Sequence, residues 1–268
     1  MRQLFQFLVT CTCAVLTFGC AKQLTNELQQ GVYPIDYMLD SKECKQKAPI
    51  TVCLQNVSNS NEFTTFKDAM IAKTKYWYFV PLGIVNFGGT GYSCELGRAS
   101  IDKNIIDFVK SAYIKEANRS GCFQLVESKN ADYSLDVSIL NHETKGPYNT
   151  YFYLYFALYI YGYGYGQTAG PGQSKVIIKT TLKGKNGSVI EKQFEKETQT
   201  DMLRNKNNVH ELRQNYVNGM VESLSMAFKD CIEKSVLSIN GEIIGKQQIS
   251  EKNQPIQQQS TIKVIESK

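Results

Sequence analysis

Few residues in this chain have the type and spacing that catalysis or metal binding requires. The only histidines are His142 and His210, which we expect in solvent, and neither lies in a pattern that predicts a catalytic triad. Eight cysteines are present, but none forms a Cys-x-x-Cys pair or a Cys/His cluster with zinc spacing. Ser93 lies in G-Y-S-C-E, where a nucleophile elbow requires Gly in place of Glu95. We therefore expect no enzyme, no metal site and no cofactor.

Cys20 is the residue with the clearest chemical role. It follows one positive charge, Arg2, and an apolar run over residues 4–18, a pattern that predicts an export signal at residues 1–19. The run is too short for a transmembrane helix. The stretch L-T-F-G-C that ends at Cys20 resembles the lipobox of bacterial lipoproteins, although its Leu lies one position early and Phe18 replaces a small residue. The resemblance implies acylation of Cys20 as the first mature residue; the alternative is an ordinary secretory signal.

Acylation would decide where the protein works. Two or more acyl chains hold a protein firmly on a membrane. Ala21 follows Cys20, whereas the inner-membrane retention signal of enteric bacteria has Asp there, so the resemblance implies a periplasm-facing anchor in the outer membrane. The net charge of +5 is spread along the chain, and we expect no nucleic-acid partner. The expected partners are the membrane, through acylated Cys20, and another envelope protein or a glycolipid.

Composition divides the chain into four segments. They are a lipoprotein signal peptide (residues 1–19), a flexible tether (20–48), a single α+β domain (49–245) and a disordered tail (246–268). The tether is polar with little periodicity and could be pinned in part through Cys44. An oxidising compartment favours disulfides, but the sequence leaves their pairing open among Cys44, Cys53, Cys94, Cys122 and Cys231.

Periodicity predicts the elements of the domain. We expect a first strand at residues 50–57, a helix capped by Ser100 that ends at Gly121, and a half-buried strand at residues 131–140. In that strand the inward side chains are Tyr133, Leu135, Val137 and Ile139. A hairpin follows, and then a second helix runs from Asn208 to about Ser238. The expected fold is an α+β two-layer sandwich, a mostly antiparallel sheet covered by two long amphipathic helices.

Two aromatic stretches are candidates for an interaction surface. Residues 76–87 predict a buried strand pair or loop, or else an apolar lip that contacts a membrane or partner. Residues 151–165 alternate apolar residues with Tyr, so one long strand would carry a Tyr ladder on one face. That strand could be central in the core, or it could cross a membrane within a sheet closed by several copies. The candidate contact residues are Tyr151, Tyr153, Tyr155, Tyr159, Tyr161, Trp77 and Phe79.

The order of elements, with the stretches ITVCLQNVS, GCFQLVES and NADYSLDVSI, resembles a broad group of periplasm-facing lipoproteins and domains. The group includes the lipopolysaccharide-assembly lipoprotein that plugs an outer-membrane translocon, curli-secretion pore lipoproteins and the N-terminal domain of the Tol-system propeller protein. The resemblance implies a lipid-anchored, non-catalytic binding or assembly accessory at the periplasmic face of the outer membrane. The alternative is a subunit of an oligomeric outer-membrane secretion pore that uses the Tyr151–Tyr165 strand. Oligomeric state and ligand stay open.

Overall fold

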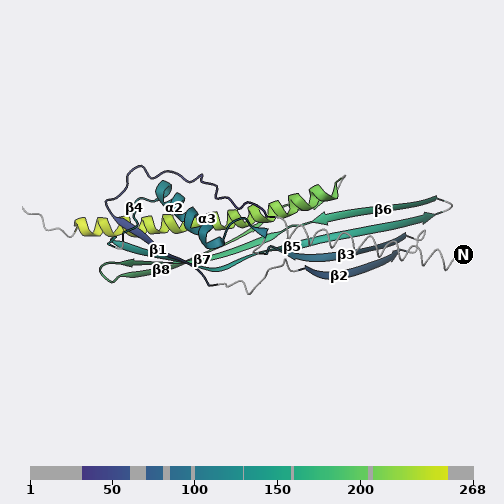
Figure 1. Cartoon of the computed structure of the whole chain (residues 1–268), viewed down its shortest axis with the longest axis horizontal. Helices are drawn as coiled ribbons and strands as arrows, with labels where there is room; N and C mark the ends of the chain where they lie inside the picture. The colour runs from purple at the N-terminus through teal and green to yellow at the C-terminus, as the bar shows by residue number, and fades with distance from the viewer. Residues whose placement is uncertain are drawn as a thin grey trace, which may run out of the picture.

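One long strand, β5 (Tyr133–Ala157), runs through both halves of the molecule (Figure 1). The computed structural model describes residues 32–60, 71–80, 85–97, 100–128, 130–157, 160–204 and 208–252. On one side β5 pairs with β1 (Thr51–Asn59) and then with β3 (Val85–Glu95). On its other side it pairs with β7 (Gln173–Gly184) and then with β6 (Ile160–Ala169). A single nine-stranded sheet therefore connects the two halves.

The half that carries the helices, which we call the body, contains β1, the first part of β5, β7 and β8 (Val189–Gln199). The short β4 (Gln124–Leu125) runs parallel to β1, and β1 runs parallel to β5. The pairs β5–β7 and β7–β8 are antiparallel. The prediction of a fold that mixes helices with a many-stranded sheet is confirmed.

The burial pattern of β5 changes phase at a β-bulge. Leu135, Val137 and Ile139 are buried as predicted, whereas Tyr133 is half-buried. The bulge between Ile139 and Asn141 shifts the register, and beyond it the even-numbered residues are buried. A bulge inserts one extra residue into a strand, so it transfers the buried side from odd to even positions.

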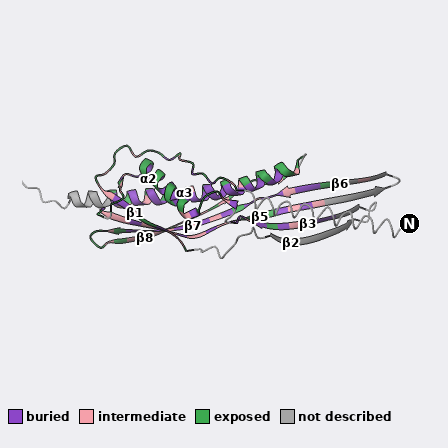
Figure 2. Cartoon of the chain, in the orientation of Figure 1, coloured by how far each residue is buried: buried purple, intermediate pink, exposed green. Residues whose placement is uncertain are grey.

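The helix α3 (Val209–Lys252) is 44 residues long, about 66 Å at the usual helical rise. It packs on β7 and β8, and its buried side chains recur every three or four residues, as predicted: Leu212, Tyr216, Met220, Leu224, Ala227 and Cys231. Figure 2 shows its buried side toward the sheet and its exposed side away from it. The side chain of Asn208 accepts a hydrogen bond from the backbone N–H of His210, which makes Asn208 the expected cap.

Both helices differ from prediction at one end. The helix α3 continues to Lys252 and does not stop near Ser238, so residues 246–252 of the predicted tail are helical and residues 253–268 lie outside the described chain. The helix α2 (Ile105–Ser120) starts later than expected, because its cap is Asn104 and not Ser100. Asn104 Oδ1 accepts from the Ile106 N–H at 2.9 Å.

Residues 32–48, which we call the strap, lie against both helices. Ile35 is fully buried, and the Tyr37 hydroxyl donates to Oε2 of the buried Glu116 on α2 at 2.7 Å. Burial and this hydrogen bond raise the pKa of Tyr37 above its usual range. The prediction of a flexible tether is therefore wrong for residues 32–48; residues 20–31 lie outside the described chain, as do the predicted signal peptide and Cys20.

The strap is fixed at its far end by a disulfide between Cys44 and Cys122, whose Cα atoms are 5.5 Å apart. This bond pins the segment at Cys44, as the sequence suggested. Nearby, Arg119 Nε donates to the Ser41 carbonyl at 2.6 Å. The other cysteines that the structure describes, Cys53, Cys94 and Cys231, are buried free thiols.

His142 lies in the core and not in solvent, because it follows the bulge that turns even positions of β5 inward. Its side chain is 4% exposed, and its ring meets Phe228 of α3 edge-on at 6.2 Å between ring centroids. His210 is exposed, as predicted. Burial lowers the pKa of His142 from 6.5 to about 4.

We predict that His142 makes the fold sensitive to acid. The unfolded chain takes up this proton below about pH 6.5 and the folded chain only near pH 4, so stability is lost as the pH falls between these values. The expected loss is about 2 kcal/mol at pH 5. The measurement is the free energy of unfolding in urea at pH 7.5 and at pH 5. His142→Leu should lack the difference due to His142, whereas His210→Gln should show the same difference as wild type. An unchanged acid loss in His142→Leu would contradict the assignment.

Candidate interaction site: the four-stranded arm

Four strands extend beyond the ends of the helices and form what we call the arm: β2 (Ile71–Val80), β3, the second part of β5 from residue 145, and β6 (Figure 1). The pairs β2–β3, β3–β5 and β5–β6 are all antiparallel. Residues 76–87 thus contribute to a strand pair, as one of the two predictions for them required; residues 81–84 lie outside the described chain.

The arm differs from the body in its charge. No Asp, Glu, Lys or Arg occurs between Tyr76 and Cys94 or between Gly146 and Ser174. In the body, the face of the sheet away from the helices carries a row of ion pairs: Lys183–Asp136 at 2.8 Å, Lys179–Glu191 at 2.7 Å and Lys175–Glu197 at 2.9 Å. An extended region without charge is typical of a contact surface.

The predicted single Tyr ladder is wrong, because residues 151–165 form a hairpin. The strand β5 ends at Ala157, β6 begins at Ile160, and these two residues are paired. Odd-numbered residues of β5 therefore face even-numbered residues of β6, and the three Tyr positions of β5 lie opposite glycines: Tyr151 opposite Gly166, Tyr153 opposite Gly164, and Tyr155 opposite Gly162. A Cβ atom at Gly166 would overlap the ring of Tyr151.

The predicted contact residues are brought onto one arm but onto two faces. Tyr151, Tyr153 and Tyr155 share one face by register. Trp77 and Phe79 are aligned through β3 with Phe152 and Leu154 on the opposite face. Tyr161 pairs with Phe156 and belongs to that second face, while Tyr159 lies outside the described chain.

The arm joins the body through a buried cluster that we call the root: Tyr92 of β3, Tyr148 of β5 and Tyr216 of α3. The ring of Tyr148 lies 6.4 Å from that of Tyr92 and 6.1 Å from that of Tyr216. The Tyr148 hydroxyl donates to the side chain of buried Gln167 on β6. Burial raises the pKa of Tyr216 above its usual range, so the cluster is neutral.

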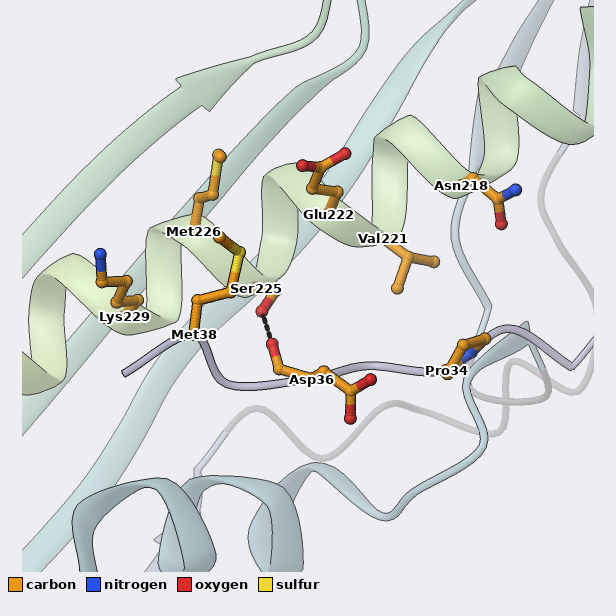
Figure 3. A pocket seen from close by; sticks show the side chains of 9 residues that line it. All are labelled: Pro34, Asp36, Met38, Asn218, Val221, Glu222, Ser225, Met226 and Lys229. Atoms are coloured by element: carbon orange, nitrogen blue, oxygen red, sulfur yellow. Dashed lines mark hydrogen bonds between the residues drawn. The ribbon is translucent and has the colours of Figure 1, made fainter. Parts of the chain in front are cut away.

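Apart from the arm, a shallow pocket between the strap and α3 is a candidate binding site by its position. It has a volume of about 260 Å³, and Figure 3 shows the side chains that line it. The Ser225 hydroxyl donates to the Asp36 carbonyl across it. Met38 and Met226 on its rim are 55% and 46% exposed. Within the described ranges no group of three or more His, Cys, Asp or Glu side chains could hold a metal ion.

No protein-family model matches the chain, and no curated protein matches it. It is similar to the solved structure of protein XCC0632 from Xanthomonas campestris, family DUF330, at 9% identity over 82% of this chain and 98% of that chain, with a TM-score of 0.47. It is also similar to hypothetical protein CT253 from Chlamydia trachomatis, at 8% identity over 74% and 99%, with a TM-score of 0.38.

Sequence reasoning missed the arm as a unit, although two signals pointed to it. The two stretches without charge are the segments that pair side by side. Glycine alternates with Tyr from Tyr161 to Gly166, and Gly in a strand often marks a close approach of another group. At Gly166 that group is the ring of Tyr151.

We predict that a methyl group added at Gly146 destabilises the packing of the root. A Cβ atom there would lie 2.7 Å from both the Gly172 Cα and the Tyr216 hydroxyl. Gly146→Ala should lower the free energy of unfolding by about 1–3 kcal/mol, the usual cost of overpacking. Gly162→Ala is the matched control, because a Cβ atom at Gly162 meets no atom within 4 Å. Equal unfolding midpoints in urea for the two variants would contradict this account of the root.

Proposed function

We propose that this protein is a lipid-anchored envelope lipoprotein that acts as a non-catalytic binding and assembly accessory at the periplasmic face of the outer membrane. The observation that carries the proposal is the arm, a four-stranded projection whose outer part has no charged residue. The strands of the arm are rich in Tyr and also contain Trp and Phe, residue types suited to contacts that are apolar in one part and hydrogen-bonded in another. Its target is another envelope protein or a glycolipid.

The strap supports an anchor at Cys20. Val32 follows Cys20 by twelve residues, so the chain between them reaches at most about 40 Å. From Val32 onward, the strap is tied to α3 by the ion pair of Asp40 with Lys229. It is also tied to the residues that flank α2, by the ion pair of Asp36 with Lys103 and the disulfide of Cys44 with Cys122. A body held this closely to its acylated residue would stay near the membrane surface.

We extend the proposal to the layering of the body. The helix α3 packs on β7 and β8, and α2 packs on α3 and β1, which supports one layer of helices on one face of the sheet. The opposite face bears the ion pairs of Lys175, Lys179 and Lys183. In this two-layer sandwich the second face is solvated, and no helix in the described residues is long and apolar enough to cross a membrane.

The anchor is tested by labelling cells with a radioactive fatty acid. We expect wild type to be labelled and to fractionate with the outer membrane, whereas Cys20→Ala loses both the label and the membrane association. Cys94→Ala is the control, because Cys94 is a buried thiol and should not be acylated. Label on Cys20→Ala, or a mature N-terminus at any other residue, would contradict the anchor.

A second candidate function is a subunit of an oligomeric outer-membrane secretion pore. The observation that favours it is the number and length of the strands in the arm: four antiparallel strands, with β2 and β6 of ten residues each. About 9–11 residues suffice for a tilted strand to cross a bilayer. Unpaired backbone groups are not tolerated there, so such a pore would need several copies.

The pore makes its own prediction. Purified wild-type oligomers added to a planar lipid bilayer should give discrete conductance steps. Tyr153→Asp, in the arm part of β5, should change their amplitude or ion selectivity, because a charge would be placed among uncharged strands. Thr181→Asp on the solvated face of the body is the control and should leave them unchanged. A defined oligomer that never conducts would exclude the pore while leaving the anchored accessory role intact.

A further inference from the structure

We propose that the arm joins copies of this chain head to tail, the β6 edge of one copy pairing with the β2 edge of the next. The inference rests on the proposed function in one respect, namely that an anchor at Cys20 holds every copy on the same membrane. It names a partner for the arm, namely a second copy of this chain.

Within the residues that the structure describes, each outer strand of the arm has an edge with little or no strand pairing. Among the strands that the structure describes, β2 pairs only with β3. The strand β6 pairs with β5, and on its other side β9 (Leu203–Arg204) covers only Thr168 and Ala169. Each edge therefore presents a row of backbone N–H and C=O groups in strands of equal length. Such a row is a template for pairing with another chain.

The β6 edge and the second half of the β2 edge lack the charges that protect an edge elsewhere in the same sheet. The strand β8 is an edge strand of the body, and it bears five charged residues: Glu191, Lys192, Glu195, Lys196 and Glu197. Proteins commonly place charges on edge strands to prevent association. The strand β6 has no charged residue, and β2 has only Lys73 and Lys75 in its first half. The difference in charge between β8 and the arm edges within one sheet favours pairing of the arm edges with another chain.

Strand direction selects which edges meet. Each pair across the arm is antiparallel, so β2 runs in the same direction as β5, and β6 runs opposite to both. A junction of β6 with the β2 of another copy is therefore antiparallel and continues the alternation without a break. It also keeps the Tyr151 face of one copy continuous with the same face of the next.

Two-fold pairing of identical edges fits less well. Pairing β2 with β2 about an axis perpendicular to the sheet turns one arm end for end and places the two bodies at opposite ends. Pairing about an axis along the strands keeps the bodies together, but it joins the Tyr151 face of one copy to the Phe152 face of the other. Copies anchored through Cys20 on one membrane keep their bodies at the same end of the arm, and of the two contacts that allow this only the head-to-tail one also keeps the Tyr151 face continuous. Such a contact closes into a ring or continues as a filament.

Cysteine cross-linking of the full-length protein in its own membranes tests the contact. One cysteine is placed on β6 by Gly162→Cys, because a Cβ atom there meets no atom within 4 Å. The second is placed on β2, in separate double variants, by Tyr76→Cys, Tyr78→Cys or Val80→Cys, positions that share the face of Gly162 by register. Because the three β2 positions are two residues apart, the three double variants test three alignments of β6 with β2. Copper phenanthroline is the oxidant: as two thiols become one disulfide, two Cu(II) ions accept one electron each and two protons are released to the solvent.

We expect a ladder of dimers, trimers and larger species on non-reducing gels for at least one of these double variants. The ladder should be lost with Phe79→Cys in place of the β2 partner, because Phe79 lies on the other face. It should also be lost with Glu195→Cys on β8. Each single variant should run as a monomer on non-reducing gels, since a head-to-tail contact brings together two different strands and so never two copies of the same cysteine. An intact Cys44–Cys122 disulfide in every variant shows that the body is folded.

Two results would overturn the proposal. Dimers formed by Gly162→Cys alone or by a β2 cysteine alone would show two-fold pairing of identical edges. Absence of cross-links in every double variant, with the body folded, would show that the β2 and β6 edges do not meet. In either case the fatty-acid labelling of Cys20 would be unaffected, so failure of this contact is distinguishable from failure of the anchor.

Discussion

The structure depends on the continuous pairing of β5 on both of its sides. Its first part is held between β1 and β7, and its second part between β3 and β6. No loop separates body from arm along this strand, so the direction of the arm is set by the same hydrogen-bonded ladder that carries the core. The bulge after Ile139 makes this possible. It turns His142 and Tyr148 toward the helix side, where Phe228 and Tyr216 of α3 cover them. A slip of one residue would expose both rings.

The strap adds a second constraint, which acts on the helices. Asn240 of α3 accepts from the Cys122 N–H at 2.7 Å and donates to the Ser120 carbonyl at 2.9 Å, which ties the end of α2 to α3. The disulfide of Cys44 joins the strap at this same point. The buried carboxylate of Glu116 is satisfied by Tyr37 and Ser120. A buried polar side chain without hydrogen-bond partners would be costly, so the hydrogen bond from Tyr37 of the strap stabilises the burial of Glu116 on α2.

The sequence predicted what depends on local periodicity. The inward positions of Leu135, Val137 and Ile139 in β5 and the buried face of α3 follow from alternation and helical spacing, and both were found, whereas Tyr133 is only half-buried. Features set by distant partners were not predictable in this way. Tyr37 resembles any tether residue until Glu116 is known to lie opposite. Ser100 is as good a cap as Asn104 until the chain around it is packed. A period of two fits one long strand and a hairpin equally well, so the faces of Tyr161 and Tyr151 could not be told apart.

Charge changes along the two central strands of the arm at one level. Glu95 of β3 pairs in register with Lys145 of β5, and Lys145 lies 2.7 Å from Glu143. Beyond these residues β3 and β5 have no charge toward the arm tip, whereas the face of the body away from the helices carries a row of ion pairs. On the neighbouring β2 the last charges, Lys73 and Lys75, lie further out, opposite Tyr92 and Thr90 of β3. The buried Tyr148 cluster lies just past the level of Glu95, so the junction of arm and body coincides with the change in charge along β3 and β5.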